Sequence, residues 1–135
     1  DVYKRQTFYQ PAMKYFEQVQ KVGQVTGSTH AMLAFTPEGK FLGGTEDVGR
    51  HVALDKLIGM RAMKKWGPVV VFLSSRASYE MVQKAAVTGI EILFAISAPT
   101  NRALCLAKEC DLTLSAFCRD NRANIYNAPE RLLNL

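Results

Sequence analysis

Apolar positions in the second half of the chain come in short continuous runs, and stretches with a helical period separate these runs. Val69–Leu73, Ile90–Ile96 and Leu112–Phe117 are almost wholly apolar, whereas the residues between them repeat their apolar positions every three or four places, up to Thr88 and up to Cys110. Buried parallel strands carry such continuous runs, and helices of this length suit right-handed crossovers. The pattern therefore predicts successive βαβ units.

The first half of the chain predicts a helix, a hairpin and a second helix. We expect the first helix from Pro11 to Gly23 and a strand at His30–Phe35. A turn at Thr36–Gly39 then leads to a returning strand at Lys40–Leu42. A last short strand is expected near the end of the chain, at Asn124–Tyr126.

Together these elements predict an α/β fold with three layers, in which a mixed, mostly parallel sheet carries helices on both faces. Residues 11–135 are expected to form one domain, a single cofactor-binding core. A chain of 135 residues that is 48% apolar can bury roughly two-thirds of its unfolded surface. Residues 1–10 carry no clear period, and we expect a disordered or artificially added start.

Charged residues crowd the segment Thr45–Lys56, which we expect to open a helix over residues 47–62. A helical wheel places Arg50 within the apolar stripe, where a buried guanidinium would need Glu46, one turn earlier, as its partner. Two interpretations of the cluster stay open: a capping and salt-bridge network, or a wall of a ligand site. Its members are Glu46, Asp47, Arg50, His51, Asp55 and Lys56.

The composition narrows the class of protein. No apolar run approaches the ~20 residues that a membrane span needs, so we expect no membrane association. Cys105, Cys110 and Cys118 form no C-x-x-C pair, which favours a reducing cytoplasm and roles as core hydrophobes. The net charge of +5 favours an anionic ligand. Lys and Arg are scattered without interleaved aromatic residues, which argues against nucleic-acid binding.

Two polar loops follow predicted strands and precede predicted helices. Ligands of open α/β sheets gather at such junctions, because helix N-termini offer free N–H groups and a positive dipole end. Ser74–Ser78 contributes Arg76 and Ser78, and Ser97–Thr100 contributes Thr100. Ser78 and Thr100 are also typical helix caps, so each hydroxyl has either a structural or a ligand-binding role.

A third polar segment lies just past the last strong apolar run. Arg119 and Arg122 flank its turn, and their guanidinium groups can grip a phosphate or a purine edge with two hydrogen bonds. A solvated turn would have a similar composition. The candidate ligand-binding residues here are Phe117, Cys118, Arg119, Asp120, Asn121 and Arg122.

Residue sets for familiar catalysis are not evident. The only histidines are His30 and His51, and the sequence contains no H-x-E followed by P-C-x-x-C, no G-x-S-x-G and no glycine-rich phosphate loop. We therefore predict no catalytic residue and no metal ligand. His30, at a strand start, is expected to be structural.

Several segments occur in the order and spacing of one protein family. They are Thr26–Ala31, Glu46–His51, Asp55–Lys56, Ser74–Lys84, Ser97–Thr100 and the stretch from Thr113 to Arg122. Over about residues 11–133 the chain resembles the formate dehydrogenase accessory sulfurtransferases, the FdhD family. The resemblance implies a cytoplasmic homodimer with a cytidine-deaminase-like core that lacks the deaminase zinc site. Met32, at the place of the glutamate in H-x-E, agrees with this.

The resemblance also implies a sulfur relay. Members of the family accept persulfide sulfur from a cysteine desulfurase and pass it to the molybdenum cofactor bis(molybdopterin guanine dinucleotide), which then enters formate dehydrogenase. The family segment that contacts the cofactor aligns with residues 117–122, where Asp120 and Asn121 replace a frequent Pro-Gly. Guanosine diphosphate (GDP) and similar nucleotides are expected to substitute for the cofactor.

The family's sulfur carrier is a cysteine in a C-x-x-C loop upstream of the segment that begins at Thr26. The first 25 residues contain no cysteine, so we expect the C-terminal core of a longer protein. Two alternatives stay open: a non-catalytic chaperone for the guanine-nucleotide cofactor, and a deaminase-like nucleotide-binding module that would need a metal.

Overall fold

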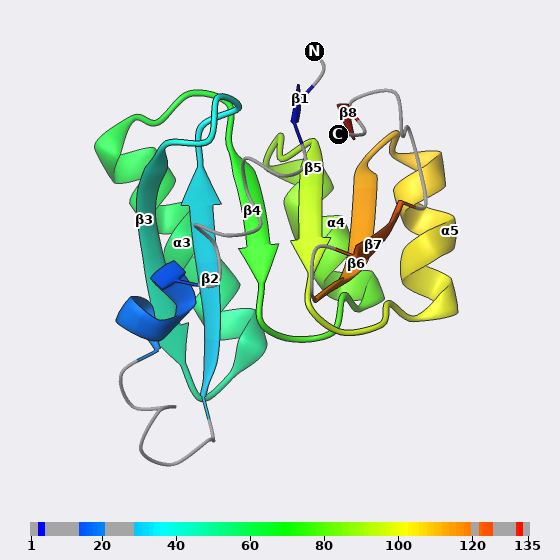
Figure 1. Ribbon diagram of the computed structural model, residues 1–135, viewed down its shortest axis with the longest axis horizontal. Helices are drawn as coiled ribbons and strands as arrows, with labels where there is room; N and C mark the ends of the chain where they lie inside the picture. The colour runs from blue at the N-terminus through cyan, green and yellow to red at the C-terminus, as the bar shows by residue number, and fades with distance from the viewer. Residues whose placement is uncertain (1–2, 5–13, 21–28, 120–121, 126–131, 134–135) are drawn as a thin grey trace.

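A mixed sheet with helices on both faces forms the centre of the computed structural model, which describes residues 3–4, 14–20, 29–119, 122–125 and 132–133. Within these residues six strands lie in the order β3-β2-β4-β5-β6-β7 (Figure 1). Their bounds are β2 His30–Phe35, β3 Phe41–Asp47, β4 Val70–Leu73, β5 Ile92–Ala95, β6 Thr113–Arg119 and β7 Arg122–Ile125. A separate parallel pair joins β1 (Tyr3–Lys4) to β8 (Leu132–Leu133).

Strand direction changes across the sheet. β4, β5 and β6 run parallel, as expected from their apolar runs, and β2 pairs antiparallel with both β3 and β4. β7 returns antiparallel to β6. The carboxyl ends of β3, β4, β5 and β6 therefore share one edge of the sheet with the start of β2.

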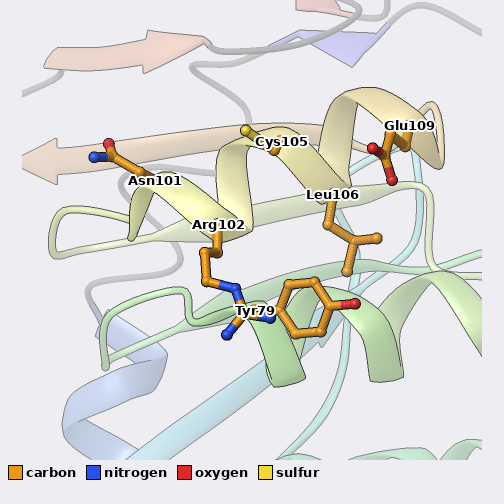
Figure 2. Close-up of a pocket in the computed structure, with 6 residues that line it drawn as sticks. All are labelled: Tyr79, Asn101, Arg102, Cys105, Leu106 and Glu109. Atoms are coloured by element: carbon orange, nitrogen blue, oxygen red, sulfur yellow. The ribbon is translucent and has the colours of Figure 1, made fainter.

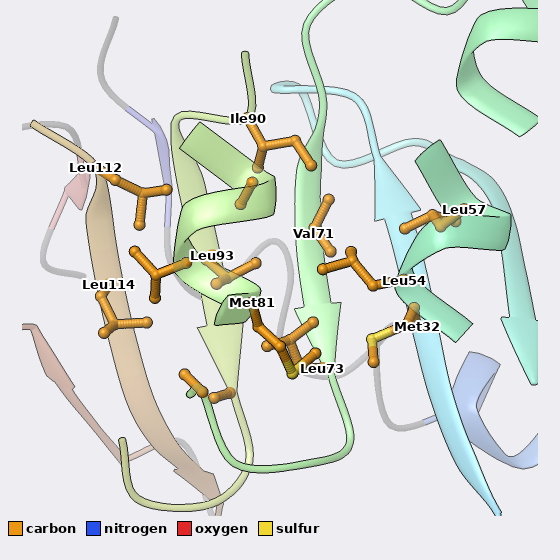
Figure 3. Packing of buried hydrophobic residues seen from close by; sticks show 14 of the residues in the cluster. Met32, Leu54, Leu57, Val71, Leu73, Met81, Ile90, Leu93, Leu112 and Leu114 are labelled. Carbon is orange, nitrogen blue, oxygen red and sulfur yellow. The ribbon is translucent and has the colours of Figure 1, made fainter. Parts of the chain in front are cut away.

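Three helices cover one face of the sheet: α3 (Arg50–Lys64), α4 (Tyr79–Val87) and α5 (Asn101–Glu109). Figure 3 shows how side chains of these helices meet those of the strands, with Leu54 and Met81 packing beside Met32, Leu73 and Leu93. All five side chains are fully buried. Burying a Leu or Met side chain contributes about 1.5–3 kcal/mol, so this interface dominates the stability of the fold.

Aromatic side chains dominate the opposite face. A short helical segment at residues 14–19 brings Phe16 onto this face, and Tyr15 stacks on Phe41 with ring centroids 3.9 Å apart. Phe72 stacks on Phe94 of the neighbouring strand at 4.6 Å. Such pairs add about 0.5–1.5 kcal/mol beyond the area that they bury.

The α/β architecture with a mixed sheet confirms the fold class predicted from the sequence, but the sheet is not mostly parallel: among the described strands of the main sheet two pairings are parallel and three are antiparallel. β2 has the expected bounds, and β4 and β5 end within one residue of the expected positions. The helix expected at 11–23 is described only over residues 14–20, and Tyr126, like most of residues 1–10, lies outside the described residues.

The returning strand of the hairpin is longer than predicted, because β3 continues from Phe41 through Gly43 and Gly44 to Asp47. Both glycines are needed for close packing. A Cβ atom on Gly43 would lie 2.9 Å from the Trp66 ring, and one on Gly44 would lie 2.8 Å from the Val19 side chain. The paired glycines, which are unfavourable for a strand by propensity, are required here by neighbours distant in sequence.

Candidate functional site

The loops after β4 and β5 meet at the carboxyl edge of the sheet, where α4 and α5 begin (Figure 1). This is the arrangement expected from the order of strands and helices. Residues 74–78 form the first loop and residues 96–100 the second. We call this region the carboxyl-edge site.

Ser74 fixes the first loop to the start of β2. Its Oγ accepts a 2.8 Å hydrogen bond from the backbone N–H of Ala31, and its own N–H donates to the carbonyl of Ala31 at 3.0 Å. The loop is therefore held across the antiparallel junction between β2 and β4, where the strand order departs from the chain order. Ligands of open α/β sheets bind at such points.

Two further hydrogen bonds join the loops to each other. The exposed Arg76 donates from Nε to the carbonyl of Ala98 at 3.1 Å, and the N–H of Thr100 donates to the carbonyl of Ala77 at 3.1 Å. Because only the Nε position of Arg76 is used in this contact, its terminal nitrogens remain available to an anion at the edge.

Ser78 and Thr100 both serve as helix caps. Ser78 Oγ accepts from the N–H of Met81 at 3.4 Å, and Thr100 Oγ1 accepts from the N–H of Ala103 at 3.1 Å. A capping hydroxyl oxygen accepts from the helix and keeps one hydrogen to donate, which Thr100 can give to a ligand and Ser78 gives to the Glu80 carboxylate. Ser78 and Thr100 therefore both have the structural role of a helix cap, one of the two roles that the sequence allowed.

The two helix N-termini differ in their electrostatics. The first turn of α4 carries Glu80, and hydrogen bonds from its own backbone N–H and from the Ser78 hydroxyl lower the pKa of its carboxyl group. The nearby guanidinium group of Arg102 acts in the same direction. The first turn of α5 has no acidic residue. An external anion therefore meets a negative charge at α4 but not at α5.

The third predicted loop lies at the same edge, because β6 runs parallel to β5 and ends at Arg119. Arg119 pairs in register with Arg122 at the start of β7, so the backbone forms a hairpin there. Asp120 and Asn121 lie outside the described residues, as do the side chains of Phe117, Cys118, Arg119 and Arg122.

The structure corrects the prediction for the charged cluster. Glu46 and Asp47 lie on β3 and α3 begins only at Arg50, so the expected helical pair between Glu46 and Arg50 does not form. Arg50 is exposed rather than buried. The physical reason is the strand pairing: β3 extends along β2 as far as the pair of Asp47 with His30.

The cluster forms a network between β3, α3 and α4. Lys56 Nζ lies 2.6 Å from Asp47 Oδ2, and this hydrogen bond, with one from the N–H of Gly49, lowers the pKa of Asp47. Lys84 of α4 pairs with Asp55 of α3 at 2.9 Å. Glu46 Oε2 accepts from the Thr29 hydroxyl at 2.7 Å. These contacts support the network interpretation.

The prediction of buried cysteines is wrong for Cys105 and Cys110, which are both exposed. Ala103 and Ala107 are the fully buried residues of α5, and Cys105 lies midway between them in sequence, on the other side of the helix. Cysteine was assigned to the core on hydrophobicity alone, whereas α5 packs on the core through the buried Ala103 and Ala107, with Leu104 and Leu106 partly buried beside them.

The side chains of the described residues include no group of three or more His, Cys, Asp or Glu residues placed to hold a metal ion. In this part of the chain no helix combines the length and apolar character needed to cross a membrane.

Comparison with known proteins identifies the family. The family model described as FdhD/NarQ matches residues 4–133. The chain belongs to the FdhD/NarQ family. Its fold is also similar to the crystal structure of a protein from Desulfotalea psychrophila that has been assigned as a formate dehydrogenase accessory protein, with a TM-score of 0.90 and 30% sequence identity. The match covers 98% of this chain and 60% of that one.

This FdhD/NarQ member has one surface feature that the sequence interpretation missed, a groove between α4 and α5. Arg102 lies over the ring of Tyr79, with its guanidinium carbon 4.5 Å from the ring centroid (Figure 2). The sequence did offer a signal for this contact. Arg102 is a basic residue in the first turn of α5, which has no acidic residue, and the preceding helix, α4, begins with the aromatic residue Tyr79.

Proposed function

We propose that this chain forms the cofactor-binding part of a formate dehydrogenase accessory sulfurtransferase. In this role it holds bis(molybdopterin guanine dinucleotide) while sulfur that originates from a cysteine desulfurase is added to the cofactor. Membership of the FdhD/NarQ family supports the proposal, as does the assignment of the similar Desulfotalea psychrophila protein. The cofactor is cargo in this scheme, and formate dehydrogenase receives it.

The observation that carries the proposal is the joining of two loops beside an N-terminus suited to anions. Arg76 and Thr100 link the loops through their hydrogen bonds to the carbonyl groups of Ala98 and Ala77. α5 begins immediately after Thr100, and its first turn carries no acidic side chain. A diphosphate at this edge would meet backbone N–H groups, a positive dipole end and the terminal nitrogens of Arg76.

The other predicted contacts follow from the same edge. β6 runs parallel to β5 and continues beyond the pair of Phe94 with Ser115 to Arg119, and in this proposal Arg119 and Arg122 contact the guanine end of the same ligand. The hydroxyl of Thr100 can donate one hydrogen bond to phosphate while it remains a cap, whereas Ser78, whose hydroxyl hydrogen is donated to Glu80, would act through the loop that it caps. The role of these residues is to hold and orient the cofactor.

A nucleotide titration tests this function. GDP carries the guanosine and diphosphate groups of the cofactor, and at a hundredfold excess over its dissociation constant it should raise the free energy of unfolding by about 2.7 kcal/mol. ATP provides the matched control, since it has phosphates but no guanine. An equal stabilisation by ATP, or none by GDP, would contradict the proposal.

A further inference from the structure

The C-terminal end of α3 brings together basic, aromatic and exposed apolar residues. Arg61 and Lys64 lie in the last turn of the helix, and Lys65 and Trp66 follow directly. Met63 lies between the basic residues in sequence and is 85% exposed, more than any other large apolar side chain among the described residues. We call these five residues the α3-end patch.

Positive charge prevails around the α3-end patch. The sequence contains no acidic residue between Asp55 and Glu80. Within the described residues neither Lys64 nor Lys65 forms a salt bridge, although Lys84 of the neighbouring helix pairs with Asp55 at 2.9 Å. The two ammonium groups of the patch are therefore available to the carboxylates of another molecule.

The helix dipole explains only part of this arrangement. Basic side chains near a helix C-terminus stabilise it by about 0.3–1 kcal/mol. Here the carbonyls of Ala62 and Arg61 already accept the N–H groups of Lys65 and Trp66, at 3.4 and 3.1 Å. The Lys64 ammonium lies over the Trp66 ring instead, 5.9 Å from its centroid. Nor does the dipole explain an apolar side chain exposed among the charges.

The surface between Arg61 and Trp66 is nearly flat. Both side chains are partly buried and line a recess of about 10 Å³, close to the space that one water molecule occupies. Pockets for small molecules measure about 300–1,000 Å³. Protein interfaces, by contrast, are enriched in aromatic residues, Met and Arg. The patch therefore suits a protein segment better than a small molecule.

We propose that an acidic segment of a partner protein docks on the α3-end patch. Its carboxylates pair with Lys64 and Lys65, and an apolar side chain of the same segment packs against Trp66 and Met63. Such charge complementarity speeds association and selects the partner. Because α3 has 15 residues, the patch lies about 22 Å from the helix start at the carboxyl edge (Figure 1). A docked partner leaves that site open, and the proposal does not rest on cofactor binding.

A labelled peptide tests the charge pairing. We expect the peptide Glu-Asp-Leu-Phe-Glu-Asp, carrying fluorescein, to bind in a fluorescence polarisation titration, and Lys64→Glu, Lys65→Glu to weaken this binding about tenfold or more. Lys14→Glu, Lys108→Glu is the matched control. It changes the net charge equally, both lysines are exposed, and Lys108 also lies in the last turn of a helix. The control should change the affinity less than about twofold at physiological salt, because distant charges are screened.

A neutral variant guards against a folding defect. Lys64→Gln, Lys65→Gln removes both charges without adding repulsion, so its loss of affinity should lie between those of the control and the reversed protein. Trp66 is the only tryptophan of the chain, and its fluorescence therefore reports on the patch itself. The peptide should shift the Trp66 emission to shorter wavelength, and Glu-Asp-Gly-Gly-Glu-Asp, which lacks apolar side chains, should shift it less.

Three results would overturn the proposal. The first is an equal loss of affinity in the Lys64, Lys65 variant and in its Lys14, Lys108 control, which would show attraction to the net charge alone. The second is an unchanged Trp66 emission at saturating peptide. The third is an absence of peptide binding, including the case in which phosphatidylserine vesicles bind through Lys64 and Lys65, since the patch would then be a membrane contact.

Discussion

Arg76 joins the loop after β4 to the loop after β5 through its 3.1 Å hydrogen bond from Nε to the carbonyl oxygen of Ala98. Thr100 makes the reciprocal connection with its N–H to Ala77. The carboxyl-edge site is thus braced without a ligand. Bracing of this kind lowers the entropy that binding has to overcome.

Removing the Arg76 side chain should weaken GDP binding about tenfold or more, because a hydrogen bond to a charged group contributes about 1.5–3 kcal/mol. Arg61 offers a matched control. Its Nη1 also donates to a backbone carbonyl, that of Thr88, at 2.9 Å, but this contact lies at the C-terminal end of α4. Calorimetric titration should show a weaker affinity for Arg76→Ala and an unchanged one for Arg61→Ala. Equal affinities of the two variants for GDP would show that Arg76 does not contribute to binding.

The cap at Thr100 should matter for stability. Thr100→Ala should lower the free energy of unfolding by about 1 kcal/mol, because the N–H of Ala103 loses its acceptor. Thr100→Ser retains the hydroxyl and should lose little. Urea denaturation of the three proteins measures the difference, and equal losses in both variants would mean that the methyl group rather than the cap carries the effect.

The contact between Asp47 and Lys56 predicts a pH dependence. Hydrogen bonds from Lys56 and Gly49 hold the pKa of Asp47 below its usual value, so the stabilisation is present at neutral pH and lost as the pH falls through this lowered pKa. Lys56→Met should raise the pKa of Asp47 in an NMR titration, whereas Lys108→Met, on α5, should not. The difference in stability between wild type and Lys56→Met should begin to shrink near pH 4, the pKa of an unfolded Asp, and vanish below the lowered pKa of Asp47. A gap that persists at pH 2 would contradict the ionic origin.

The exposed Arg50 should tolerate substitution. Arg50→Ala should change the free energy of unfolding by less than about 0.5 kcal/mol, as is usual for surface positions. Leu54→Ala, one turn later on the buried side of α3, should cost about 2–5 kcal/mol. A large loss for Arg50→Ala in chemical denaturation would place its guanidinium in the interior after all.

The central strands could be predicted because they are buried on both faces. β4 and β5 contact helices on one side and aromatic residues on the other, so every position is apolar and the run itself marks the strand. β3 could not be delimited in this way. It contains Gly43 and Gly44, where the Trp66 and Val19 side chains leave no room for a Cβ atom. This requirement comes from the tertiary packing and is not visible in the sequence.

The candidate site also has parts that could be predicted from the sequence and parts that could not. The order of strands and helices places the loops at 74–78 and 96–100 on one edge, so their proximity could be predicted. The hydrogen bond between Arg76 and Ala98 could not, since it depends on the conformations of both loops. The exposure of Cys105 was missed because the buried face of α5 is centred on Ala103 and Ala107, and hydrophobicity alone did not show which side of the helix faces the sheet.

Mapping GDP by two-dimensional amide NMR tests the central claim, binding at the carboxyl-edge site, most directly. The account predicts that GDP shifts the amide signals of residues 75–78 and 98–102, while Gly39 and Gly89, at the other end of the sheet, stay in place. Arg76→Ala should reduce these shifts at the same GDP concentration. Shifts confined to the opposite edge, or to the groove along Cys105 and Glu109, would contradict it.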